Sequence, residues 1–331
     1  MSEPVVRDGL TLDPELQAVL LIREQWGLPP ITDLPLAEMR ERTRQEAMVA
    51  AGEPEPVGSV SDLVVPGADG DLAARLYVPS AEDEPASGVG PLLVFFHGGG
   101  FVFGDLDTHD GVCRVLCRYA GVRVLAIDYR LAPENKYPAA VEDARAVLDW
   151  VVAHADELGA DPARVAVGGD SAGGHLAAVV SQFAARDGGS APALQVLLYP
   201  PMDRPGSYPS KELFADGFFL TQREIDFFEA AYAGGVDDDP ADARRHPMVG
   251  DLARLAPAIV VTAGFDPLRD EGEAYAAALS AGGTPVELRR YPSLIHGFAN
   301  MIGFSRAARD ALVEIAEEVG RRLRGGGGAE V

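Results

Sequence analysis

The spacing of apolar side chains divides roughly the first quarter of the chain into a helical part and a stranded part. Apolar positions recur at helical intervals over residues 16–26 and 35–51, which predicts two helices. The first follows Asp13-Pro14-Glu15, and this order of cap, proline and acid is typical of a helix start. Shorter runs at 60–65 and 72–78 flank a turn rich in proline and glycine, so they predict an antiparallel pair of strands.

After residue 91 the pattern becomes a regular alternation of short apolar runs and longer helical stretches. Strands that are apolar throughout and separated by helices predict a mostly parallel sheet with helices on both faces, which is an α/β fold. A chain of 331 residues is long enough to bury one large core of this kind. The predicted strands are 92–96, 122–128, 165–168, 194–199, 258–263 and 286–291, and the predicted helices are about 107–120, 138–157, 172–186, 269–281 and 303–324.

One segment, residues 203–250, interrupts this alternation and contains the capping box Thr221-Gln222-Arg223-Glu224 at the start of a helix. Together with the N-terminal helices it is expected to form a cap over the carboxyl ends of the strands, where ligands bind in such sheets. The expected organisation is an N-terminal cap part (1–50), a first core part (51–202), an inserted cap segment (203–250), a second core part (251–324) and a flexible glycine-rich tail (325–331).

Charge and composition exclude several classes of function. The chain has 51 acidic and 28 basic side chains and a net charge of -23, a balance that disfavours nucleic acid and anionic membranes as partners. The excess of acidic side chains is compatible either with the coding bias of a GC-rich genome or with adaptation to salt. The start of the chain lacks the pattern of a signal peptide and no run is long enough for a membrane span, so a cytoplasmic location is expected. Cys113 and Cys117 are expected to be two buried thiols, and no metal site is predicted.

The clearest chemical signal is Gly169-Asp170-Ser171-Ala172-Gly173-Gly174, between a predicted strand and a predicted helix. Glycines two residues before and two after Ser171 allow a tight strand-to-helix turn that exposes a nucleophilic hydroxyl above the sheet. The dipole of the following helix favours developing negative charge at this place. The alternative is a helix cap in which Ser171 only binds backbone amides, and the flanking strand and helix favour the nucleophile.

A second glycine-rich turn, His97-Gly98-Gly99-Gly100, follows the predicted strand 92–96 directly. Acyl transfer creates an oxyanion that needs preorganised N–H donors, and glycines allow a loop to present its amides to a substrate. The expected donors are the amides of Gly99, Gly100 and Ala172. A phosphate-binding loop is disfavoured because the lysine and the glycine spacing of such loops are missing. A plain strand-to-loop turn is the remaining alternative.

A serine nucleophile needs a base, most often histidine, and a carboxylate that orients the imidazole. In proteins whose serine nucleophile lies on such a strand-to-helix turn, the acid and then the histidine come after the serine along the chain. Asp266 and His296 each follow a late predicted strand and satisfy this order. Asp270 and Glu271 follow the same strand as Asp266, but they fall in the first turn of a predicted helix, where acids offset the helix dipole.

The other five histidines are weaker candidates for the base. His97 belongs to the glycine-rich turn and is expected to organise it. His109, His154 and His175 lie in helical patterns, which favours structural or exposed roles. His246 precedes Asp266 and therefore violates the order, so His296 is the predicted base.

With these residues in place, the chain resembles the hormone-sensitive-lipase-like family of esterases, which includes bacterial carboxylesterases and arylacetamide-deacetylase relatives. The resemblance covers about residues 10–322. It rests on His97-Gly98-Gly99-Gly100, Asp128-Tyr129-Arg130-Leu131-Ala132-Pro133-Glu134, Gly169-Asp170-Ser171-Ala172-Gly173-Gly174, Asp266-Pro267-Leu268-Arg269-Asp270-Glu271 and His296-Gly297-Phe298.

This resemblance implies the α/β-hydrolase fold, with a mostly parallel central sheet flanked by helices and covered by a helical cap. It implies hydrolysis of short- to medium-chain acyl esters through a covalent acyl-enzyme intermediate, without a cofactor. It also implies a triad of Ser171, Asp266 and His296, and structural support of the site by residues 128–134.

Four apolar residues near the predicted cap, Phe101, Phe218, Phe219 and Leu220, are candidate contacts for the acyl or alcohol part of an ester. Packing of the cap onto the core would explain them equally well. The expected partner is a small-molecule ester, and a homodimer is compatible with the sequence. Two rival functions are a hormone-receptor-like binding protein, which retention of the whole triad disfavours, and amide hydrolysis or an elimination at the same site.

Overall fold

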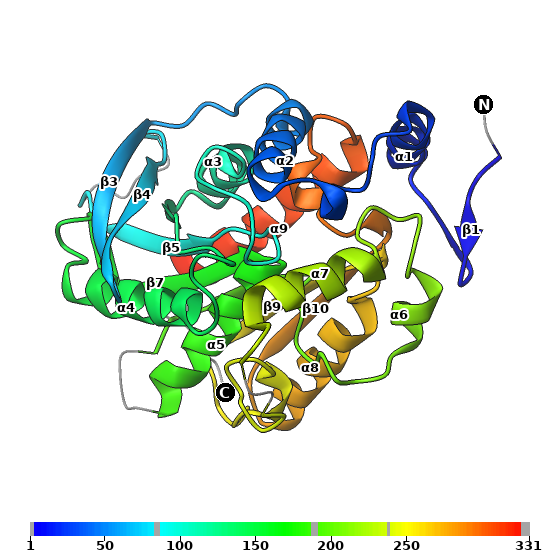
Figure 1. The fold of residues 1–331 in the computed structure, drawn as a ribbon. Coiled ribbons are helices and arrows are strands. Elements are labelled where there is room, and N and C mark those ends of the chain that lie inside the picture. The colour runs from blue at the N-terminus through cyan, green and yellow to red at the C-terminus, as the bar shows by residue number, and fades with distance from the viewer. Residues whose placement is uncertain (1–2, 83–86, 187–190, 237–238, 326–331) are drawn as a thin grey trace.

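The structure, a computed structural model, describes residues 3–82, 87–186, 191–236 and 239–325 (Figure 1). Among them is one sheet of eight strands in the order β10-β9-β8-β7-β5-β6-β4-β3. The antiparallel hairpin β3 (Ser59–Gly67) and β4 (Gly70–Val78) forms one edge, and β4 pairs antiparallel with β6. The parallel strands are β5 (Gly90–Phe96), β6 (Arg123–Ile127), β7 (Ala160–Asp170), β8 (Gln195–Leu198), β9 (Ala258–Phe265) and β10 (Val286–Ile295).

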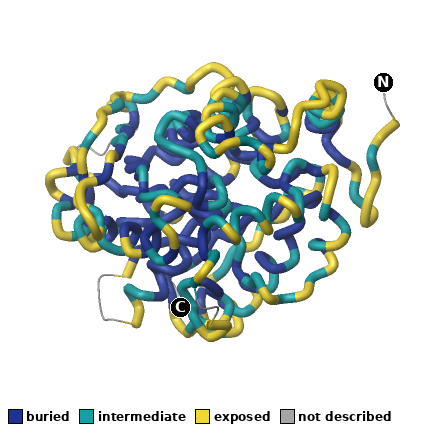
Figure 2. Tube along the Cα trace, viewed as in Figure 1, coloured by how far each residue is buried: buried dark blue, intermediate teal, exposed yellow. Residues whose placement is uncertain are grey.

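Helices cover both faces of this sheet, as the apolar strands predict. One face packs against α3 (Asp110–Ala120) and α9 (Arg306–Arg324). The other packs against α4 (Ala139–Ala153), α5 (Ala172–Arg186) and α8 (Arg269–Ala281) (Figure 1). Figure 2 shows the consequence, a buried interior along the sheet and exposed chain around the periphery. The predicted α/β fold is thus confirmed.

The remaining elements lie outside the sheet. The predicted start of α1 at Asp13 is confirmed, since its carboxylate accepts the Leu16 amide at 3.0 Å. The capping box of α7 is also present: the Glu224 amide donates to Thr221, and the Thr221 amide donates to the Glu224 carboxylate. These elements are β1 (Val6–Arg7), β2 (Leu10–Thr11), α1 (Pro14–Trp26), η1 (Ile31–Asp33), α2 (Leu36–Ala51), α6 (Pro209–Leu213), α7 (Gln222–Ala233), η2 (Pro247–Val249) and η3 (Phe298–Asn300).

Some boundaries differ from the sequence predictions. The pair β1 and β2 was not predicted, because two residues per strand leave no periodic pattern. Strand β10 continues past the predicted end at residue 291, with an irregularity in its pairing to β9 before Ile295. Residues 326–331 of the predicted tail lie outside the described residues. Within the part of the chain that is described, no helix is both long and apolar enough to cross a membrane.

The turn between β7 and α5 packs against the end of β5 through main chain alone. A Cβ atom added at Gly173 would lie 1.8 Å from the carbonyl oxygen of Phe96, and one added at Gly169 would lie 2.3 Å from the same oxygen. Real Cβ atoms do not approach backbone atoms to such distances, so both positions require glycine. This contact places the turn at Ser171 beside the loop that follows Phe96.

Replacing Gly173 with alanine is expected to lower the free energy of unfolding by more than about 3 kcal/mol, because overpacking already costs about 1–3 kcal/mol where side chains can yield. Here the obstacle is a strand backbone. The matched control is Gly272→Ala in the first turn of α8, where the new methyl would lie 3.2 Å from a movable Thr262 methyl group. We expect the control to stay within about 1 kcal/mol of the wild type in urea unfolding followed by circular dichroism. Equal stability of the two variants would contradict the prediction.

Candidate active site

The structure brings the predicted nucleophile, base and acid into one hydrogen-bonded row. Ser171 occupies the turn between β7 and α5 with a left-handed φ of 51°, and its amide donates to Leu198 at 2.8 Å. The Nε2 atom of His296 lies 3.0 Å from the Ser171 Oγ atom. The Nδ1 atom of the same ring lies 2.8 Å from Asp266 Oδ2. A non-glycine residue in this backbone region is strained, which is common at reactive positions.

Strands β9 and β10 supply the acid and the base. Asp266 follows β9 and is fully buried, and its second oxygen accepts the Leu268 amide at 2.8 Å. A carboxylate can only accept from His296, so the Nδ1 atom carries the proton. The Nε2 atom then has a lone pair for the Ser171 hydroxyl, which is the arrangement that general-base activation requires. Ser171 is half-buried, so a substrate can reach it.

The two alternative acids of α8 have other partners. The Asp270 carboxylate accepts the Ser210 amide at 2.9 Å. Glu271 is buried, accepts the Met202 amide at 2.7 Å and forms an ion pair with Lys211 at 2.8 Å. Both carboxylates therefore tie α8 to the segment after β8, and Asp266 is the acid that faces the imidazole.

The glycine-rich loop after β5 has an unusual backbone. Gly99, Gly100 and Phe101 follow one another with φ values of 116°, 60° and 64°. A Cβ atom at Gly99 would lie 2.0 Å from the Phe103 carbonyl oxygen, and one at Gly100 would lie 2.4 Å from the Phe228 ring of α7. Glycine is thus required at the two predicted oxyanion positions of this loop, for conformation and for space.

A buried carboxylate joins this loop to the nucleophile turn. Asp170 Oδ1 accepts the Gly98 amide at 2.8 Å, and Oδ2 accepts the side-chain amide of Asn300 at 3.2 Å. His109 Nε2 lies 3.2 Å from Oδ1. Burial alone would raise the pKa of Asp170, but the interactions with His109 and the Gly98 amide lower it overall, which keeps the group ionised.

Sequence reasoning assigned no role to Asp170, Asn300 or the ring of His109 in this cluster. For Asp170 a signal was present, since a carboxylate directly before a nucleophile must be stabilised by donors when it is buried. Asn300 and His109 lie 130 and 61 positions away from Asp170, and no local pattern links them.

His97 is buried behind the loop and lies near Asp128, whose side chain is partly exposed. His97 Nδ1 donates to the Gly98 carbonyl at 2.7 Å, and the ring stacks on Tyr129 with 4.3 Å between centroids. Its Nε2 atom is buried, has no hydrogen-bond partner among the described residues and lies 4.0 Å from Asp128 Oδ1. Burial lowers the pKa of His97 to about 4 and raises the pKa of Asp128 to about 6. The imidazole is therefore neutral at pH 7.

The four candidate substrate contacts lie in different surroundings. The Phe101 ring stacks on Tyr232 of α7 at 3.9 Å between centroids. Phe218 packs in the core against Phe214 and Phe265, and Leu220 is nearly buried. Phe219 is half-buried beside Gly297, the neighbour of His296. Their roles stay predictions, and Phe228 at Gly100 joins them as a residue that sequence reasoning missed.

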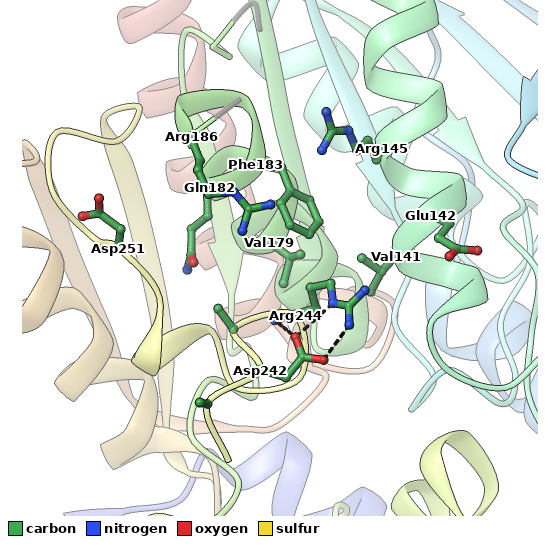
Figure 3. A pocket seen from close by; sticks show the side chains of 12 residues that line it. Val141, Glu142, Arg145, Val179, Gln182, Phe183, Arg186, Asp242, Arg244 and Asp251 are labelled. Carbon is green, nitrogen blue, oxygen red and sulfur yellow. Dashed lines mark hydrogen bonds and ion pairs between the residues drawn. The ribbon is translucent and has the colours of Figure 1, made fainter. Parts of the chain in front are cut away.

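A cavity of about 540 Å³ lies elsewhere, between α4, α5 and residues 241–251 (Figure 3). Arginines and acids surround Phe183 in it, and two of them, Asp242 and Arg244, bond each other at 2.8 Å. Ser171 and His296 do not line it. The hydrogen-bonded row of Ser171, His296 and Asp266 thus lies outside this cavity.

The described residues contain no cluster of three or more His, Cys, Asp or Glu side chains that could hold a metal ion. Cys113 and Cys117 are both buried in α3, as predicted. Burial raises the pKa of the Cys113 thiol.

Comparisons with known proteins identify the family of the chain. The sequence model of a family described as "alpha/beta hydrolase fold" matches residues 93–300. The carboxylic ester hydrolase LipN of Mycobacterium tuberculosis is 50% identical over 321 residues, which cover 93% of this chain and 83% of the relative. Ethyl acetate hydrolase of Pseudomonas putida is 37% identical over 321 residues, covering 95% and 100%. A solved ester hydrolase from the metagenome of Lake Arreo has a TM-score of 0.91 at 38% identity and covers 95% of this chain and 99% of its own.

Replacing Asp128 with asparagine is expected to raise the melting temperature at pH 8 by about 1–3 °C. The folded-state pKa of about 6 lies above the ordinary 3.8, so the folded protein favours the protonated carboxyl. This contribution to stability is fully present at low pH and is lost as the pH rises from 3.8 to about 6. The gain of the variant should therefore shrink between pH 6 and pH 4, which thermal unfolding across that range would measure. A variant that is less stable than the wild type at pH 8 would refute the raised pKa of Asp128 in the folded protein.

Proposed function

Since the chain belongs to the α/β-hydrolase family and is a carboxylic-ester hydrolase, we propose that Ser171, His296 and Asp266 form its catalytic triad. The observation that carries this proposal is the continuous row of hydrogen bonds, 3.0 Å from Ser171 Oγ to His296 Nε2 and 2.8 Å from His296 Nδ1 to Asp266. Such a row activates a hydroxyl that is otherwise a weak nucleophile at neutral pH.

The reaction then proceeds in two halves. The Ser171 oxygen attacks the ester carbonyl carbon while His296 Nε2 takes the hydroxyl proton, and the carbonyl oxygen becomes an oxyanion. When this intermediate collapses, the bond to the alcohol breaks and His296 gives its proton to the departing oxygen. Water then attacks the carbonyl carbon of the acyl-serine while His296 Nε2 takes a water proton. When this second intermediate collapses, the carboxylic acid leaves and His296 returns the proton to Ser171. Asp266 orients the imidazole and stabilises the imidazolium that forms in each half of the reaction.

We assign the oxyanion donors to the amides of Gly99, Gly100 and Ala172. Two observations support this assignment. The left-handed φ values at Gly99 and Gly100 turn that loop away from strand geometry directly beside the nucleophile turn. Ala172 is the first residue of α5, where the backbone amides of a helix are unpaired and the dipole favours negative charge.

The cap made of residues 1–50 and 203–250 limits the acyl group to short and medium chains. The Phe228 ring on α7 supports this part of the proposal, because it lies directly against Gly100. The Phe103 ring meets it edge-on, with 5.7 Å between centroids. Two aromatic rings therefore crowd the space beside the proposed oxyanion site.

Replacing Ser171 with alanine is expected to lower kcat for p-nitrophenyl esters by about 10⁵–10⁶-fold, the usual cost of removing a triad nucleophile. The matched control is Ser181→Ala on α5, the helix that follows Ser171, since the Ser181 hydroxyl donates to the Ala177 carbonyl at 3.0 Å. Rates would be measured from acetate to palmitate for all three proteins. Activity that survives in Ser171→Ala would eliminate the proposed nucleophile.

Replacing Phe228 with alanine is expected to raise the ratio of kcat/KM for p-nitrophenyl octanoate over acetate by at least about 10-fold. Removing the ring opens space beside Gly100, and one methylene in an apolar pocket is already worth about 10–200-fold. Phe227→Ala removes the same ring from the neighbouring position of α7 and should leave the ratio unchanged within about twofold. If both variants shift the ratio equally, general loosening of α7 is the cause and Phe228 sets no limit.

A further inference from the structure

The loop that carries the proposed oxyanion donors is held in a conformation that it would not adopt alone. Three consecutive residues, Gly99 to Phe101, have left-handed backbones, and Phe101 lacks the freedom of glycine. A non-glycine residue in this region is strained and persists only where the surroundings fix it. The contacts that fix this loop are therefore part of the machinery that stabilises the oxyanion.

Two neighbouring segments hold the outer side of the loop. The Ala132 amide donates to the Phe101 carbonyl at 2.8 Å. The next carbonyl along the loop, that of Val102, accepts from Arg40 Nε at 2.8 Å. Within the loop, the amides of Val102 and Phe103 both donate to the Gly99 carbonyl, at 3.0 and 3.1 Å. A shift of the Val102 carbonyl therefore acts directly on the peptide groups of Gly99.

Arg40 lies on α2, about 60 positions before the loop that it contacts. One terminal nitrogen donates to the Ala132 carbonyl at 2.9 Å, and the guanidinium binds both carboxylate oxygens of Glu134 at 2.8 Å. A single planar group thus joins the oxyanion loop to residues 132–134. The next turn of α2 continues the contact, because Arg44 pairs with Asp105 and Asp107 just beyond the loop.

We infer that Arg40 is a positioning residue for the oxyanion hole, acting through the Val102 carbonyl to hold the Gly99 and Gly100 amides on the reacting carbonyl. This inference rests on the proposed function. It makes α2 a structural component of the hole in addition to its proposed place in the cap. The hydrogen bonds described for Arg40 go to Val102, Ala132 and Glu134 and not to the proposed triad, so its loss should act on transition-state stabilisation and leave ground-state binding largely unchanged.

A lysine cannot replace Arg40 in this arrangement. The four hydrogen bonds leave from fixed directions of one rigid plane, whereas an ammonium group offers three donors from a single point. Charge alone would keep α2 attached near Glu134 but would not reach both carbonyls and the carboxylate together. Arg40→Lys therefore separates positioning of the loop from simple attachment of the helix.

Arg42 provides the matched control. It lies two positions further along α2, and its side chain donates to the Glu46 carboxylate at 2.9 Å and to the Pro29 carbonyl at 2.8 Å. Glu46 lies on α2 itself, and Pro29 lies in the connection between α1 and η1. Arg42→Ala thus removes an arginine of the same helix without touching the loop or residues 132–134. Glu134→Gln provides a graded test, because it weakens the carboxylate contact and leaves both carbonyl contacts in place.

The experiment compares kcat and KM for p-nitrophenyl acetate, and the inhibition constant of an aliphatic trifluoromethyl ketone, in wild type and four variants. Ser171 Oγ adds to the ketone carbon, His296 takes the hydroxyl proton, and the ketone oxygen becomes a stable oxyanion. For Arg40→Ala and Arg40→Lys we expect kcat to fall by about 10–100-fold, since a misplacement of about 1 Å can cost 10²-fold. The inhibition constant should rise by a similar factor, while KM stays within about threefold.

For Arg42→Ala we expect all three quantities within twofold of the wild type, and for Glu134→Gln a loss smaller than that of Arg40→Lys. The inference is overturned if folded Arg40→Lys keeps kcat and the inhibition constant within twofold, or if Arg42→Ala loses as much as Arg40→Ala. If Arg40→Ala does not fold, Arg40→Lys and Glu134→Gln decide by the same criteria. A wild type that does not hydrolyse the ester would refute the proposed function itself, before any Arg40 variant is compared.

Discussion

The close contact between the nucleophile turn and the end of β5 sets the geometry of the whole site. No side chain separates the two main chains, since added Cβ atoms at Gly169 and Gly173 would lie 2.3 and 1.8 Å from the Phe96 carbonyl oxygen. The distance from Ser171 to the loop after Phe96 is thus fixed by covalent geometry and backbone contact, independently of how side chains pack. Protein interiors are dense enough to transmit small shifts, and catalysis tolerates little displacement, so this contact is the constraint on which the other interactions build.

The site also contains two buried carboxylates, and each of them needs hydrogen-bond donors because it is buried. A buried charge is strongly unfavourable unless hydrogen bonds compensate it, so Asp170 and Asp266 each specify the position of several donors. Asp170 fixes the Gly98 amide and Asn300, and through them the loop after β5 and the segment after β10. Asp266 fixes the ring of His296. Exchanging either carboxylate for a neutral group would leave donors unpaired on two different elements, which explains how one residue can influence distant parts of the site.

The sequence predicts the features that arise from local pattern, and the structure confirms most of them. Continuous apolar runs predicted the parallel sheet, and the order of Ser171, Asp266 and His296 along the chain matches the row that the structure forms. What sequence reasoning missed depends on contacts between segments without shared periodicity. The Phe228 ring lies on Gly100 although 128 positions separate them, and nothing in the pattern of α7 distinguishes Phe228 from Phe227. Such pairings follow only from how α7 docks on the loop.

Phe101 shows how local strain and distant contacts combine. Its left-handed backbone costs free energy that a glycine would largely avoid, so the side chain must offset that cost. The ring does so by stacking on Tyr232 of α7, while the Phe101 carbonyl accepts the Ala132 amide on the other side. Because Arg40 of α2 binds the neighbouring carbonyl, helices from two separate parts of the chain act on the same strained loop. A displacement of α2 or α7 would therefore also disturb the loop. The position of these two helices is thus coupled to the proposed ability of the loop to stabilise an oxyanion.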